Sequence, residues 1–299
     1  MFPREASKRL CAGGCFSRPP ALNVQLSTIN SVRAGFTLLE LLIVIGIIAL
    51  LFVLLTPAFT TIKSGGDVTS AAYTIKGVLD TARTYAKANN TYVWVGFAEE
   101  NAGSNPPATP TATPAASPYP SGRLVMAIVA SKDGTTIYNP NSPNNPDPID
   151  PTKLTPVTKL VKIDNVHLPL FAAGTGAGDG FDARPSPSPA SDYNYSRFGD
   201  LNVAGLSAPL TDSQFPFQYP VGSPVPTAQY VFRKTLQFTP RGECRINSTY
   251  DVRRVIEIGL LQTHGSIVPT PTPSAGNYIG NVAAVQITGF GGSVKIYRR

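Results

Sequence analysis

Apolar side chains are almost unbroken from Phe36 to Phe59, where Glu40 is the one charged residue. At 1.5 Å per residue, these 24 residues make a helix of about 36 Å. The hydrocarbon core of a bilayer is about 30 Å thick. The pattern therefore predicts a membrane-spanning or filament-core helix over residues 36–59.

A second pattern begins beyond Gly65-Gly66, where we expect a hinge. Apolar residues then recur at steps of three and four, which is typical of one helix face. They are Val68, Ala72, Ile75, Leu79, Ala82 and Ala86. Charged residues occupy the adjacent positions, with Lys76 and Asp80 at helical contact spacing. Asn89-Asn90 is a plausible stop. Residues 60–90 are predicted to form an amphipathic helix whose apolar stripe packs on a sheet.

Residues 91–299 are rich in short runs of β-branched and aromatic residues, which favour strands. The predicted strands are Thr91–Ala98, Arg123–Ala130, Thr158–Ile163, Ala228–Phe238, Val252–Leu260, Ala283–Thr288 and Ser293–Tyr297. The glycine-rich segment 289–292 predicts a hairpin turn between the last two. The expected fold class is α+β: one long N-terminal helix packed on an antiparallel β-sheet head.

Proline-rich stretches separate these strands. They are Asn105–Ser121, Asn139–Pro151, Arg184–Ala190 and Pro269–Ser274. Proline alternating with Thr, Ser and Ala favours extended, solvated loops. Loop insertions in the head are expected, and O-glycosylated or partner-binding loops are the alternative.

Charge is concentrated before the apolar run. The first 35 residues hold Arg4, Lys8, Arg9, Arg18 and Arg33 against Glu5 alone. The positive-inside rule therefore places residues 1–35 in the cytoplasm and the head outside. The other cations do not cluster on one element, so no nucleic acid partner is expected. A cleaved secretory signal is an alternative, for which Thr56-Pro57-Ala58 would be a poor cleavage site.

Glu40 is the most informative residue of the apolar run. A carboxylate at mid-bilayer costs about 2.5–3.5 kcal/mol and less near an end, so it usually marks function. A lone acid at the edge of a span can also extend to the interface. The flanking residues decide between these interpretations.

Gly35-Phe36-Thr37-Leu38-Leu39-Glu40 resembles the class III signal of type IV pilins and type II secretion pseudopilins. The resemblance implies that a prepilin peptidase cuts after Gly35 and methylates the new N-terminal residue, Phe36. Glu40 then becomes the fifth mature residue, the characteristic acid of this family. Pro57 stands where pilins commonly carry a helix-kinking proline, and it removes one backbone donor.

The same resemblance implies an assembly mechanism. Glu40 of an incoming subunit would meet the freed amino group of a neighbour, which relieves a carboxylate otherwise unpaired in lipid. The implied partners are prepilin peptidase, other pilin or pseudopilin subunits, an inner-membrane assembly platform and membrane lipid. The implied location is the bacterial inner membrane, with the head in the periplasm, and then a filament or the cell surface.

The end of the chain carries a looser resemblance. Segments 71–97, 236–246, 255–260 and 285–298 are similar to GspH-type minor pseudopilin domains. The layout is also similar to prepilin-like proteins of the Verru_Chthon cassette protein D group. The domains expected are a removed leader (1–35), the apolar helix (36–59), the amphipathic helix (60–90) and a β-rich periplasmic head (91–299).

Candidate catalytic chemistry is sparse. His167 and His264 lack metal-ligand spacing, and prolines interrupt the oxygen-rich segment 139–151. Cys244 would be alone once the leader with Cys11 and Cys15 is removed. We expect no enzyme activity, no catalytic residue, no cofactor and no metal. The alternatives are a membrane-tethered binding module or enzyme, and an unprocessed signal-anchor protein.

Overall fold

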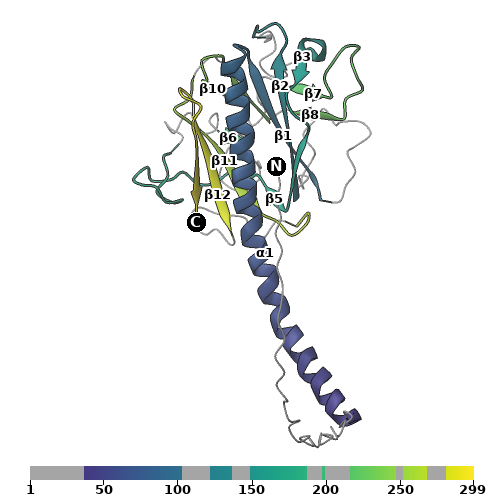
Figure 1. Ribbon diagram of the computed structural model, residues 1–299. Helices are drawn as coiled ribbons and strands as arrows, with labels where there is room; N and C mark the ends of the chain where they lie inside the picture. Colours follow the sequence, from purple (N-terminus) through teal and green to yellow (C-terminus); the bar gives the residue numbers. More distant parts are fainter. Residues whose placement is uncertain are drawn as a thin grey trace, which may run out of the picture. The chain divides into compact units, whose positions relative to one another are not determined.

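The computed structural model of the chain describes eight segments, with the backbone alone for 54–66 and 197–198. These segments are 37–102, 122–136, 149–186, 197–198, 216–232, 234–246, 252–267 and 281–299. The chain divides into two compact units, Met1–Val53 and Leu54–Arg299. The first contributes the start of the helix, and the second holds all the strands (Figure 1).

Helix α1 runs over Leu38–Ala88 as one assigned element, including the positions of Pro57 and Gly65-Gly66. The predicted stripe is buried in the head, with Val68, Ile75 and Leu79 at 2% exposure or less. The predicted pair also forms, because Lys76 Nζ lies 2.8 Å from Asp80 Oδ2. The amphipathic half of the helix is thus confirmed from Asp67 onward.

The helix ends at the predicted asparagines. Asn90 adopts a positive φ of 50°, and the Thr91 N–H donates to Ala86 O at 3.1 Å. Asparagine tolerates this left-handed conformation, and the backward hydrogen bond satisfies a carbonyl of the last turn. The chain then turns directly into the first strand.

Two antiparallel sheets form the body of the head. The six-stranded sheet has the order β10-β9-β1-β2-β3, and β4 also pairs with β2. Its strands are β1 (Val93–Asn101), β2 (Gly122–Ser131), β3 (Leu154–Pro156), β4 (Val161–Asp164), β9 (Lys234–Phe238) and β10 (Cys244–Arg245). A 3-10 turn, Pro151–Lys153, precedes β3.

The five-stranded sheet has the order β13-β12-β11-β5, and the short β6 pairs parallel with β11. Its strands are β5 (Val166–His167), β6 (Arg197–Phe198), β11 (Val255–Gln262), β12 (Val282–Thr288) and β13 (Val294–Arg298). The predicted glycine-rich hairpin joins β12 and β13 in antiparallel register. The α+β class is confirmed, but the prediction of one sheet is wrong, since two large sheets share the core.

The helix packs against both sheets through a single apolar cluster. Ile75 and Leu79 of α1 share it with β1, β2 and β9 of one sheet and with β11 and β12 of the other. Side chains alternate across a strand, so each sheet also has an outer face that needs cover. The two outer faces are covered differently.

An apolar cluster covers the outer face of the six-stranded sheet. The two-stranded sheet of β7 (Phe217–Tyr219) and β8 (Tyr230–Phe232) packs there. Phe217 and Phe232 meet with ring centroids 5.1 Å apart and share a cluster with Trp94. The predicted single strand Ala228–Phe238 is therefore two strands, β8 and β9, in different sheets.

A buried ion pair holds the cover of the five-stranded sheet. The Arg184 guanidinium donates through Nε and Nη2 to the Glu257 carboxylate, at 2.7 and 3.0 Å. Gln286 Nε2 donates to the same carboxylate at 2.7 Å. Arg184 also donates to Phe181 O and Ala172 O, and its guanidinium lies over the Phe181 ring. The segment before Pro185 is thus fastened to β11 and β12.

Candidate functional site

The N-terminal motif is described from Thr37 onward. The Glu40 N–H donates to Thr37 Oγ1 at 3.2 Å, and the Leu41 N–H donates to Thr37 O at 3.1 Å. Thr37 is therefore the N-cap of α1, and Glu40 stands three positions later in its first turn. An acid there also complements the positive end of the helix dipole. The spacing Thr-x-x-Glu was a sequence signal for this cap, and the sequence analysis did not use it.

Exposed apolar side chains follow the cap. Leu38 is 87% exposed, Leu42 63% and Val53 74%. Contiguous exposed apolar surface of this kind usually marks contact with a partner or a membrane. The span expected over residues 36–59 is not found: among the described residues, no helix carries an apolar stretch of membrane-crossing length.

The predicted site residues differ in what the structure says of them. Gly35 and Phe36 lie outside the described residues, so cleavage and methylation stay predictions. Glu40 is described and exposed on the first turn of α1. Pro57 lies within α1, its side chain is not described, and the kink stays a prediction. Within the described residues, the Glu40 backbone N–H contacts Thr37, and the Glu40 carboxylate is not brought to another predicted site residue.

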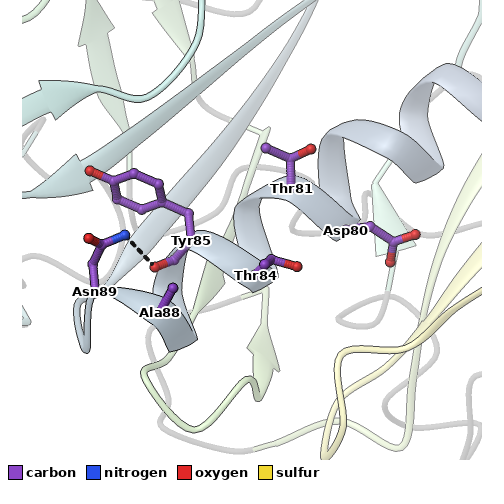
Figure 2. A pocket seen from close by; sticks show the side chains of 6 residues that line it. All are labelled: Asp80, Thr81, Thr84, Tyr85, Ala88 and Asn89. Atoms are coloured by element: carbon purple, nitrogen blue, oxygen red, sulfur yellow. Dashed lines mark hydrogen bonds between the residues drawn. The ribbon is translucent and has the colours of Figure 1, made fainter.

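A second surface feature lies on the exposed face of α1 near its end. Side chains of the last turns line an open depression of about 470 Å³, and Figure 2 shows these side chains as sticks. The lining residues are Asp80, Thr81, Thr84, Tyr85, Ala88 and Asn89. Asn89 Nδ2 donates to Tyr85 O at 3.1 Å, which ties the helix end to itself (Figure 2). The depression is thus formed by side chains of α1 and of the turn that follows it.

Buried ionisable groups of the head bind one another. Glu99 on β1 accepts from the Leu168 N–H at 2.9 Å and lies 2.8 Å from His167 Nδ1. Because β1 and β5 belong to different sheets, this pair links the two sheets. Glu100 likewise lies 3.3 Å from Arg123 Nη1 and 3.4 Å from Lys162 Nζ. Such pairs are typical of structural networks.

Two pKa shifts agree with a structural role. The hydrogen bond from Lys162 to the Tyr230 hydroxyl raises the pKa of the ammonium, and Glu100 adds to the effect. Burial raises the pKa of the Cys244 thiol, and Cys244 is a free, fully buried cysteine. A thiol that stays protonated is a poor nucleophile.

The described residues also bear on metal ligation. There, no cluster of three His, Cys, Asp or Glu side chains could hold a metal ion. Of the oxygen-rich segment, Asp150 is described, and its Oδ1 accepts from the Thr152 N–H at 2.9 Å. Asp150 thus caps the 3-10 turn before β3.

The burial of Arg184 was not predicted. Arg184 begins the expected proline-rich loop Arg184–Ala190, whereas the structure buries its side chain at 1% exposure beside Glu257. No local signal identifies it, because the partner stands 73 residues away.

Comparison with known proteins bears on the N-terminal motif alone. The family model for the prokaryotic N-terminal methylation motif matches residues 30–56. No curated protein and no solved structure matches the chain. The matched segment contains Gly35, Phe36, Glu40 and most of the apolar run. It supports a prepilin-type protein whose N-terminal segment is a substrate of prepilin peptidase.

Proposed function

We propose that the chain is a structural subunit of a type IV pilus or a type II secretion pseudopilus. Prepilin peptidase cuts it between Gly35 and Phe36 and methylates the Phe36 amine. The apolar start of α1 anchors it in the inner membrane, with the head in the periplasm. An assembly platform then moves the subunit into a filament. The role is structural, and it needs no cofactor.

The motif match over residues 30–56 carries this proposal. The described geometry supports it in two ways. Glu40 lies exposed among apolar side chains, so its carboxylate is available to an amino group from outside the chain. The apolar residues 38–53 are also exposed, as a helix needs if it exchanges lipid contacts for contacts with neighbouring helices. More specifically, the proposed subunit is a minor one that is similar to GspH-type pseudopilins and to the Verru_Chthon cassette protein D group.

Gly35→Ala is the decisive test. The chain is co-expressed with a prepilin peptidase, and its intact mass is measured after extraction from membranes. The native chain is expected to begin at a methylated Phe36. The variant is expected to keep residues 1–35, because a side chain at position 35 obstructs the bond to be cut. A native chain that still begins upstream of Phe36 would refute the proposal.

A matched control is Gly46→Ala, in the apolar run that follows Gly35. A Cβ at Gly46 meets no atom within 4 Å, so the change is sterically neutral. This variant is expected to be cut like the native chain. Equal loss of cutting in both variants would mean that the run as a whole, rather than Gly35, is recognised.

A further inference from the structure

We propose that the end of the head around the last turns of α1 binds an acidic polysaccharide, through sugar units that carry carboxylates. The binding residues are Arg83, Lys87, Arg241 and Phe290, here called the tip surface. This assignment goes beyond the proposed filament role and does not depend on cleavage at Gly35. It is built from packing, charge and exposure within the head.

Two glycine turns bring the four residues together. A Cβ atom at Gly242 would lie 3.0 Å from Lys87 Cδ, and one at Gly292 would lie 3.1 Å from Arg83 Cδ. A Cβ atom at Gly292 would also lie 2.4 Å from Gly242 O, so the two turns touch. Both glycines have a positive φ, of 86° and 61°, which other residues rarely adopt. Arg241 directly precedes Gly242, and Phe290 lies two residues before Gly292, so both belong to these turns.

The cations of the tip surface have no anionic partner within the described residues. Arg83 and Lys87 stand one helical turn apart, where like charges repel. The carboxylates on the same segments are already paired, Asp80 with Lys76 and Glu243 with Arg245. Arg83 Nε is buried without a hydrogen-bond partner. An open depression of about 420 Å³ between Arg83 and Lys87 leaves room for an anion.

Phe290 adds an apolar ring to this charged surface. Its side chain is 73% exposed at the β12–β13 turn. The turn is held by the Thr288 N–H to Ser293 O bond at 3.0 Å and the Gly292 N–H to Thr288 O bond at 2.7 Å. Thr288 Oγ1 and Ser293 Oγ also lie 2.7 Å apart. A ring presented by an ordered turn loses little conformational freedom on binding.

A uronate sugar matches both chemistries at once. Its C–H face can lie on the electron-rich face of an aromatic ring, while its carboxylate accepts charge-assisted hydrogen bonds from Arg and Lys. Single-stranded nucleic acid fits less well, because its binders stack successive bases on several aromatic side chains. A second copy of the chain also fits less well, since each copy carries a net positive charge with or without residues 1–35.

The test uses the full chain purified in detergent, with oligogalacturonate as the probe and neutral galactan as its uncharged counterpart. Saturable, salt-sensitive binding to oligogalacturonate alone is expected. The double variant Lys87→Gln/Arg241→Gln is expected to weaken binding about tenfold or more. Phe290→Ser is expected to weaken it several-fold. All three side chains are exposed, so the head should keep its fold.

The matched control is Lys159→Gln/Arg298→Gln, which removes two exposed cations elsewhere on the head. It is expected to change affinity less than about twofold, by the weak action of distant, screened charges. Equal loss in both double variants, or equal binding of galactan, would overturn the assignment. So would tighter binding of oligodeoxythymidylate or of polyglutamate. The intact mass of the same preparation reports cleavage separately, so failure of the filament proposal is distinguishable.

Discussion

Glu40 and Glu257 are both carboxylates on apolar elements, and the chain treats them in opposite ways. Glu257 is 2% exposed and receives the Arg184 guanidinium and the Gln286 amide from its own head. Glu40 is exposed, and among the described residues it forms no ion pair. Glu257 is thus paired within the head, whereas Glu40 has no such partner within the described residues and, under the proposed function, would be paired by a neighbouring subunit.

The apolar side chains of α1 show the same contrast. Ile75 and Leu79 are fully buried against both sheets, whereas Leu42 is 63% exposed. The later turns of α1 therefore stabilise the fold of the head, and the earlier turns are the part that, under the proposed function, contacts neighbouring subunits. Substitutions in α1 and in the head test this difference between the early and the later turns, from the largest expected effect to the smallest.

Glu40→Ala should have the largest effect, and that effect should be on assembly alone. Losing the carboxylate removes the proposed pairing with a neighbour's amine, which we expect to reduce filament incorporation about tenfold or more. Cleavage after Gly35 should continue. The measurement compares sheared filaments with the membrane fraction by immunoblot. Asp179→Ala is the control, since Asp179 is an exposed carboxylate that already pairs with Lys295 of the same head. Normal incorporation of the Glu40 variant would contradict the pairing.

Glu257→Ala, in contrast, should lower the stability of the head. It leaves the Arg184 guanidinium buried without its counter-charge, and breaking such a pair costs about 3–5 kcal/mol. We expect the free energy of unfolding to fall by that amount, measured by denaturant titration with the buried Trp94 as the fluorophore. The double variant Arg184→Met/Glu257→Ala should recover part of the loss. A loss below about 1 kcal/mol would mean that the ion pair does not hold the cover of the sheet.

Leu79→Ala and Leu42→Ala compare the same substitution in the two parts of α1. Leu79 is fully buried, so truncation leaves a cavity and should cost about 2–5 kcal/mol of unfolding free energy. Leu42 is largely exposed, so its truncation should leave the unfolding of the head unchanged within about 0.5 kcal/mol. Both values come from the Trp94 titration of the full chain in detergent. Equal losses of unfolding free energy would mean that the early and the later turns of α1 contribute alike to the stability of the head.

The sequence predicted the elements whose signal is local. The stripe through Ile75 and Leu79 requires only helical periodicity, and Asn89-Asn90 ends it through the left-handed conformation of Asn90. Strands β1, β2, β11, β12 and β13 fall within a few residues of their predicted positions, because each is rich in β-branched or other apolar residues.

The elements it missed depend on distant partners. β5 has two residues, and its place is set by pairing with Leu261 and Gln262 of β11. Likewise, no sequence pattern between residues 228 and 238 marks where β8 ends and β9 begins. The two strands are separate because they pair in different sheets. Of the candidate site, the motif from Gly35 to Glu40 was predicted on sequence, and the structure adds the Thr37 cap. The tip surface could not be predicted, because its four residues come from three separate segments.

Gly77→Ala is the smallest change and the most informative about the exposed face of the later turns. A Cβ at Gly77 meets no atom within 4 Å, so nothing in the head requires glycine there. Glycine within a helix costs about 1 kcal/mol relative to alanine. If the division of α1 holds, the variant should gain about 0.5–1 kcal/mol in the Trp94 titration and enter filaments normally. A more stable head that enters filaments poorly would mean that a neighbour approaches closely at Gly77. The exposed face of the later turns would then also be a contact surface for a neighbouring subunit, as is proposed for the early turns.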